Sequence, residues 1–365
     1  MAPRRGGGGG GGGGGSVSAS CPDPFTGYTT TPEEFASICV FLVVALLTLI
    51  AMFRVRKRHP GAKRILGGIY IVGLLFFFIG YALQLVGTLL LECGTTPYLT
   101  YYNWTIAWNI LFRISTFLLL VCTVWLVNCS LREKLGHSST YFNVIYGVVL
   151  GVIGILAAAL VGLTCYNIWS LTQDYYWYDD APANLGQAQN KLGLAHWILY
   201  WLAALVAGAL SIVNIVSMRS KRINTQGLLG WIIALTISMF IWVLFNIVEF
   251  GIVVSPNLNV YPPLEFYTAA SWIINFFQAL SWIFLIVIAK SRALAPSTTA
   301  DTNAPMYPNN TYLGPQGPVY TQVAQQPQHA YNYANGGQQH YYTQQPVYNG
   351  PGSIHGLQPY PAEVK

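Results

Sequence analysis

The chain alternates between long apolar stretches and short polar connections. A helix rises about 1.5 Å per residue, so a stretch of roughly 20 apolar residues crosses the ~30 Å hydrocarbon core of a bilayer. Strands of a membrane barrel need only about 9–11 residues each, so these lengths favour helices. The pattern predicts an all-α membrane protein, a bundle of seven transmembrane helices. The seven stretches lie at residues 35–53, 65–91, 104–127, 142–165, 194–216, 228–254 and 266–289.

Composition gives the same result. Of the 365 residues, 53% are apolar and only 8% are charged, which is too little polar surface to cover a soluble globule. A net charge of +6 is also found in proteins that bind nucleic acid. Here the basic residues form short clusters between the apolar stretches, as in membrane proteins. We therefore expect the lipid bilayer, and no nucleic acid, as the partner of this region.

The basic clusters predict an orientation. Six Lys and Arg residues follow the first stretch, within residues 54–64, and further ones follow the third, fifth and seventh stretches. The connections on the other side contain only Lys191. The positive-inside rule then places the N-terminus outside and the C-terminus in the cytoplasm. Residues 1–34 lack the apolar core of a cleavable signal peptide, so we expect the first helix to direct insertion, and the plasma membrane as location.

Three zones follow from this pattern. Residues 1–34, with ten consecutive glycines, form a predicted disordered outer tail, and residues 35–290 form the seven-helix domain. Residues 291–365 combine Pro, Tyr and Gln with few aliphatic side chains, so burial cannot offset chain entropy and we expect a disordered cytoplasmic tail. Such a tail is typical of a docking segment for cytoplasmic protein partners, or of a solvated spacer.

Two ionisable side chains lie well inside the apolar stretches, Arg113 in the third and Glu249 in the sixth. An ionised group near the bilayer centre costs roughly 2.5–3.5 kcal/mol by insertion scales, so each needs a partner or a wet cavity. Counting residues from the outer ends places both in the outer half of the membrane. We therefore predict that Glu249 pairs with Arg113.

Amide side chains share helical faces with these charges. Amides avoid lipid, so their faces should converge in one polar layer in the outer half of the bundle. Two interpretations stay open: the layer locks helix packing, or it forms the floor of an outward-open pocket for a small molecule or ion. The predicted ligand-binding residues are Arg113, Glu249, Asn246, Asn275, Gln278, Asn109, Gln84 and His196, the last at the outer end of the fifth stretch.

Three further sequence features concern the outer side of the protein and the packing of its helices: the cysteines, a glycosylation sequon and the glycines. Cys93 and Cys165 lie at the outer ends of the second and fourth stretches, so we expect a disulfide between them, with Cys21 left over. The sequon at Asn103 adjoins the third helix, which disfavours glycan transfer. In the second stretch, glycines recur every seven residues, at 73, 80 and 87, which predicts close helix packing on that face.

The predicted spans lack the sets of side chains that membrane-embedded enzymes use for catalysis. His196 is the only histidine in a span and no Asp lies in any of them, so neither a metal hydrolase nor an aspartyl protease site can be assembled. The glycine run at 6–15 is not followed by the Lys of a phosphate-binding loop. We therefore expect no enzyme, no metal and no cofactor.

Seven helices with an outer N-terminus resemble the topology of G-protein-coupled receptors over residues 35–290. The third helix ends in VNCSLREK, without the acid-Arg-aromatic triplet of rhodopsin-like receptors, and none of the 20 prolines lies inside a span. The seventh helix has Asn275 and Gln278 and lacks the Lys of retinal-binding opsins. In general organisation the chain is also similar to seven-helix membrane proteins of filamentous fungi, which include receptors and lipid-translocating exporters.

The resemblance implies a receptor or sensor-like protein with a cytoplasmic signalling or docking tail. An odd number of helices and no internal similarity favour this function over a transporter built from two repeats. A transporter or lipid-translocating protein that uses the same polar layer is the first alternative. A structural or scaffolding membrane protein that acts through its tail is the second.

Overall fold

The computed structural model describes residues 21, 32–93, 98–136, 140–172, 185–223, 225, 227–254 and 263–294, and this part of the chain is helical apart from short connections. Seven helical rods are long and apolar enough to cross a membrane, which confirms the predicted fold class. The third rod joins α3, a π-helical segment and α4 without interruption. The helices are α1 (Pro32–Arg58), α2 (Gly68–Glu92), α3 (Tyr98–Val121), α4 (Asn128–Lys134), α5 (Thr140–Thr172), α6 (Gly186–Ser220), α7 (Leu228–Val254) and α8 (Leu264–Ala289), with short helices η1 (Pro60–Lys63), η2 (Cys122–Val127) and η3 (Arg292–Leu294).

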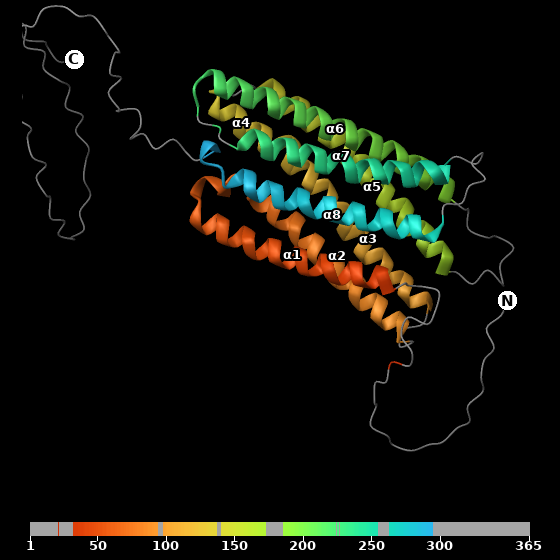
Figure 1. Ribbon diagram of the computed structural model, residues 1–365. Coiled ribbons are helices and arrows are strands. Elements are labelled where there is room, and N and C mark those ends of the chain that lie inside the picture. Colours follow the sequence, from red (N-terminus) through yellow and green to blue (C-terminus); the bar gives the residue numbers. More distant parts are fainter. Residues whose placement is uncertain are drawn as a thin grey trace, which may run out of the picture. The chain divides into compact units, whose positions relative to one another are not determined.

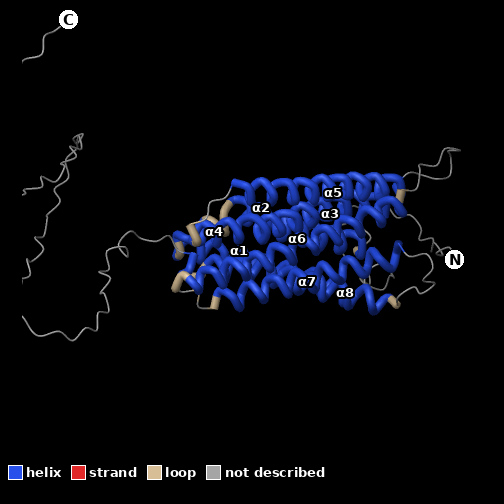
Figure 2. The backbone as a smooth tube through the Cα atoms, turned by 90° about the horizontal axis from the view of Figure 1, so that it is seen from above, coloured by secondary structure: helices blue, strands red, loops and turns tan. Residues whose placement is uncertain are grey.

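The rods lie side by side with their axes roughly aligned (Figures 1 and 2). Each packs against its neighbours in sequence: α1 against α2, α2 against α3, α3 against α5, α5 against α6, α6 against α7 and α7 against α8. The last helix, α8, returns to α1 and closes a ring. The segment η2 and α4 also pack against α6, so one end of the third rod lies inside the ring.

The two ends of the bundle differ in charge. Basic residues gather at what we name the basic end, where α1, α4 and α6 finish and α8 gives way to Lys290. Arg64 forms an ion pair there with Glu133 of α4, and Lys221 Nζ donates a 2.9 Å hydrogen bond to the carbonyl oxygen of Leu135. We name the opposite end, where α2 finishes, the disulfide end. The orientation of these ends across a membrane stays a prediction.

Apolar side chains cover the outside of the ring as well as its interior. The largest buried side chains include Trp242 and Trp282, whereas Leu47 and Ile155 are more than half exposed. A hydrophobic exterior is what a lipid environment allows, because acyl chains solvate such side chains as well as the protein core does.

The glycines of α2 make room for aromatic rings. A Cβ atom added at Gly73 would lie 2.6 Å from the ring of Trp282, and one at Gly87 would lie 2.8 Å from the ring of Trp108. Gly80 likewise meets a ring of α3. The predicted close packing on this face is confirmed, and the space that the missing side chains leave is filled by indole and phenyl groups.

The predicted disulfide between Cys93 and Cys165 is wrong. Cys93 is bonded to Cys21, and Cys165 is a free cysteine. The reason is the order of the helices in the ring: α2 packs against α1 and α3, whereas α5, which carries Cys165, packs against α3 and α6. Cys165 lines a small space together with Asn109 and Arg113 of α3. Equal depth in the membrane therefore did not imply proximity.

The predicted disorder of the two tails lies outside the described residues, apart from Cys21, the start of α1 and the turn η3. The acidic and aromatic connection between α5 and α6 is also outside them.

Candidate functional site: a polar cavity between the helices

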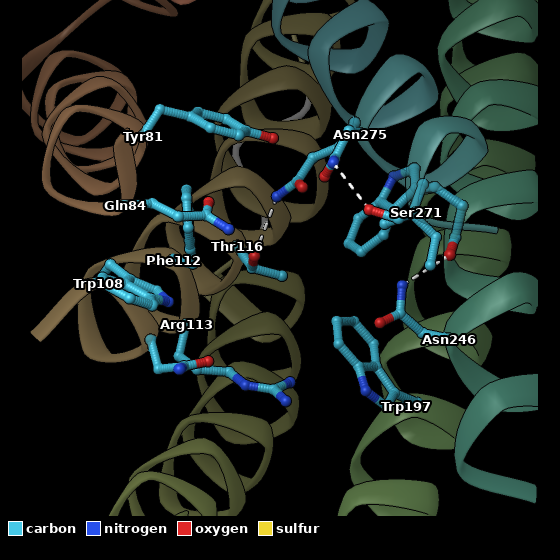
Figure 3. Close-up of a pocket in the computed structure, with 14 residues that line it drawn as sticks. Tyr81, Gln84, Trp108, Phe112, Arg113, Thr116, Trp197, Asn246, Ser271 and Asn275 are labelled. Carbon is cyan, nitrogen blue, oxygen red and sulfur yellow. Dashed lines mark hydrogen bonds between the residues drawn. The ribbon is translucent and has the colours of Figure 1, made fainter. Parts of the chain in front are cut away.

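A cavity of about 260 Å³ lies inside the ring, in the half nearer the disulfide end (Figure 3). Gln84 in its wall is about eight residues from the end of α2, or roughly 12 Å along the helix. Helices α2, α3, α6, α7 and α8 all contribute to the wall. The lining residues are Tyr81, Gln84, Trp108, Asn109, Phe112, Arg113, Thr116, Trp197, Trp242, Asn246, Ser271, Ile274, Asn275 and Gln278.

The structure brings most of the predicted polar layer together around this cavity. Arg113 and all the predicted amides line it, namely Gln84, Asn109, Asn246, Asn275 and Gln278. Helical spacing and the avoidance of lipid by polar groups were enough to predict this convergence. Whether these residues bind a ligand stays a prediction.

Three of the amides are fixed by bonds to their own helices. Asn109 Nδ2 donates to the carbonyl oxygen of Thr105 at 2.8 Å, and Asn246 Nδ2 donates to that of Trp242 at 2.8 Å. The third bond, 3.4 Å long, runs from Asn275 Nδ2 to Ser271 Oγ. A primary amide has two N–H donors and an acceptor oxygen, so each bond leaves one N–H and the oxygen available. The wall therefore offers both donors and acceptors.

Arg113 is the one charged residue that lines the cavity in the described part of the chain. Its guanidinium lies 5.2 Å from the ring centroid of Trp197 and 5.9 Å from that of Phe250, and it points across the cavity from α3 toward α6 (Figure 3). These are cation–π contacts. Within the described residues the guanidinium has no hydrogen bond and no ion pair. Its N–H donors therefore face the cavity unpaired.

The predicted pairing of Glu249 with Arg113 is wrong. Glu249 neither lines the cavity nor forms an ion pair with Arg113. Arg113 instead meets Phe250, one residue further along α7, which packs against α6. The prediction used depth alone, and depth does not fix the direction around a helix.

His196 also lies outside the cavity. It is 2% exposed, with its ring 5.3 Å from that of Trp197, which lines the cavity. Its Nδ1 has no hydrogen-bond partner in the described part of the chain. Trp197, the next residue along α6, lines the cavity in its place.

A hydrogen-bonded floor closes the cavity on the side of the basic end. Gln278 Nε2 donates to Thr116 Oγ1 at 3.1 Å, and the hydroxyl of Tyr200 donates to the carbonyl oxygen of Thr116 at 3.0 Å. These bonds tie α3 to α8 and to α6. The ring of Trp242 packs edge-on against Tyr200, with 5.4 Å between centroids. The floor is thus rigid and filled.

Sequence reasoning missed part of the aromatic wall, namely Trp108 and Phe112 of α3. Aromatic residues occur on both the buried and the exposed faces of the helices, so their spacing gave no separate signal. The close-up shows their rings around the amides and Arg113 (Figure 3).

The cavity continues toward the disulfide end. A second space of about 200 Å³ shares Gln84, Ser271 and Asn275 with it and extends to Glu34 in the first turn of α1. Asn103, the sequon residue, is exposed on α3. Its glycosylation stays a prediction.

Comparison with known proteins gives no match: no family model, no curated protein and no solved structure is similar to this chain.

Proposed function

We propose that this multi-pass membrane protein is a receptor or sensor-like protein that binds a small anionic ligand, such as an organic acid, in the polar cavity. The observation that carries the proposal is the unpaired guanidinium of Arg113, which faces the cavity with no acidic partner among the described residues. An ionised group in the membrane interior costs roughly 2.5–3.5 kcal/mol by insertion scales. Water or an anion in the cavity offsets this cost.

The chemistry of the wall favours an anion over a cation. The lining residues include no Asp, Glu or His, and a cation would be repelled by Arg113. A planar guanidinium matches a carboxylate with two parallel hydrogen bonds. The amides of Asn246 and Asn275 then supply bonds to further polar groups, and the aromatic rings cover the apolar part. A volume of about 260 Å³ suits a metabolite-sized ligand.

The closed floor supports the receptor hypothesis over transport. A transporter needs a path from the cavity to the opposite end, whereas Thr116, Tyr200 and Gln278 join three helices across that path. The ligand signal would pass through α3 and α6 to the basic end and to cytoplasmic partners of residues 291–365.

Thermal unfolding of the purified protein in lipid nanodiscs tests this proposal. A panel of small carboxylic acids is compared with the corresponding neutral amides. We expect at least one acid, but not its amide, to raise the Tm, because only the acid pairs with Arg113. Arg113→Gln should abolish the shift, and Arg113→Lys should retain part of it.

Glu249→Gln is the matched control, because it removes a charge from the same membrane depth outside the cavity. A shift that persists in Arg113→Gln, or equal shifts from acids and amides, would contradict the proposal. Uptake of the stabilising acid into proteoliposomes would instead favour the transporter alternative. Deletion of residues 295–365 should leave the Tm shift intact while removing cytoplasmic partners.

A further inference from the structure

An apolar groove of about 400 Å³ runs along the outside of the bundle between α5 and α6. Its floor includes Val124 of the π-helical segment η2. Its walls are almost entirely aliphatic and aromatic carbon. They consist of Phe142, Ile145, Tyr146, Val148, Val149, Val152 and Ile153 from α5, and Leu199, Leu202, Ala203, Val206, Ala207 and Leu210 from α6.

The length of the groove matches one leaflet of a bilayer. On α5 it extends from Phe142 to Ile153, and on α6 from Leu210 back to Leu199. Each wall is therefore about 16 Å long at 1.5 Å per residue, close to half of the ~30 Å hydrocarbon core. Phe142 is in the first turn of α5, so the groove starts near the basic end and finishes near the middle of the membrane.

A cation without a counter-ion lies at the head of the groove. The guanidinium of Arg132 in α4 stacks 3.5 Å from the ring centroid of Phe142. It has no ion pair among the described residues, whereas its neighbour Glu133 is paired with Arg64. Its Nη1 is buried without a hydrogen-bond partner in the described part of the chain, and the side chain as a whole is half-buried.

Tyr146 lies beneath this cation. The side chain is 4% exposed, and its hydroxyl is buried without a hydrogen-bond partner in the described part of the chain. The hydroxyl adjoins the guanidinium of Arg132. The head of the groove therefore holds two polar groups with unused hydrogen-bonding capacity, beside a wall that is otherwise apolar.

We propose that this groove binds an anionic glycerophospholipid, with the phosphate on Arg132 and one acyl chain between α5 and α6. Charge complementarity selects the headgroup, because the guanidinium of Arg132 has no acidic partner among the described residues. The length of the walls matches that of an acyl chain within one leaflet. Phe142 holds the guanidinium by its cation–π contact, and Tyr146 supports it from below as a positioning residue. The site is separate from the polar cavity and does not depend on its ligand.

Native mass spectrometry of the full chain, delipidated in detergent and titrated with dioleoyl phosphatidylglycerol or dioleoyl phosphatidylcholine, tests the proposal. We expect tighter binding of the anionic lipid, and about tenfold weaker binding of it by Arg132→Gln, because a charge-assisted hydrogen bond is lost. Arg132→Lys should recover part of the affinity. Lys57→Gln is the matched control, since it removes an exposed charge at the basic end of α1, away from the groove.

A second variant tests the acyl half of the site. Val206→Trp places a bulky ring in the groove from a residue that is 58% exposed, so the core is not disturbed. It should lower the affinity for both lipids, and an unchanged Tm shows that the variant folds. Equal losses in Arg132→Gln and Lys57→Gln would overturn the proposal.

Two further results would also overturn it. Displacement of the lipid by soluble glycerol phosphate at equal concentration would mean a phosphate site without a role for the acyl chain. A dimer that Val206→Trp abolishes, with no lipid bound, would mean that a second copy of the chain covers the groove.

Discussion

Asn128 holds the irregular part of the third rod against α6, and Asn128→Leu should destabilise the bundle. The residue is completely buried directly after the π-helical segment η2. Its Nδ2 lies 3.2 Å from the carbonyl oxygen of Val124 and 3.3 Å from that of Ala207 in α6. Its Oδ1 accepts a 3.0 Å hydrogen bond from Ser211 Oγ, also in α6. One side chain thus satisfies the widened helix and joins it to a neighbour.

The expected loss follows from these contacts. Two of the bonds cross between helices, and such bonds in membrane proteins average about 0.6 kcal/mol each. Leucine also leaves the buried hydroxyl of Ser211 without its acceptor, which costs roughly 1–3 kcal/mol. The sum is about 2–4 kcal/mol of unfolding free energy.

Unfolding by denaturing detergent in mixed micelles, followed by circular dichroism, measures this loss. Asn128→Leu, Ser211→Ala and the double variant form a thermodynamic cycle, in which we expect a coupling of about 0.6 kcal/mol or more. Asn103→Leu is the control, because Asn103 is exposed on the same rod and should change stability by less than about 0.5 kcal/mol. Wild-type stability of Asn128→Leu, or zero coupling to Ser211, would refute the role assigned to this amide.

Two further predictions use the same unfolding assay. Gly73→Ala should lower the unfolding free energy by about 1–3 kcal/mol, because its Cβ would lie 2.6 Å from Trp282. Gly151→Ala, with open space around it, should be neutral or slightly stabilising. Equal effects of the two substitutions would contradict the packing described for α2. Arg113→Gln and Glu249→Gln should be additive within about 0.5 kcal/mol, since the two side chains do not form an ion pair. A double variant that recovers stability lost in either single one would show that they interact.

The helices could be predicted because their signal is local. Membrane spans follow from the length of apolar stretches, and the sixth span, 228–254, coincides with α7. One cavity brings together Asn109, Arg113, Asn275 and Gln278, and this convergence was also predictable. Helical spacing puts the polar residues of each helix on a single face, and polar faces turn away from lipid.

What could not be predicted depends on neighbours far away in sequence. The direction of Glu249 depends on the rotation of α7, which apolar residues on all sides leave undefined. The partner of Cys93 depends on which segment reaches the end of α2, and Cys21 reaches it. The π-helical segment is stabilised by Ala207 and Ser211 of another helix, so nothing within residues 122–127 indicates it.

The central claim is that Arg113 creates a positive, solvent-accessible cavity. Thiol modification of the Asn275→Cys variant in membrane vesicles tests it most directly, with a negatively charged and a positively charged methanethiosulfonate reagent. We expect the added Arg113→Gln substitution to lower the ratio of anionic to cationic reaction rates several-fold at this position, but not at Asn103→Cys on the exposed face of α3. A ratio that Arg113→Gln leaves unchanged, or an introduced thiol that neither reagent reaches, would contradict it.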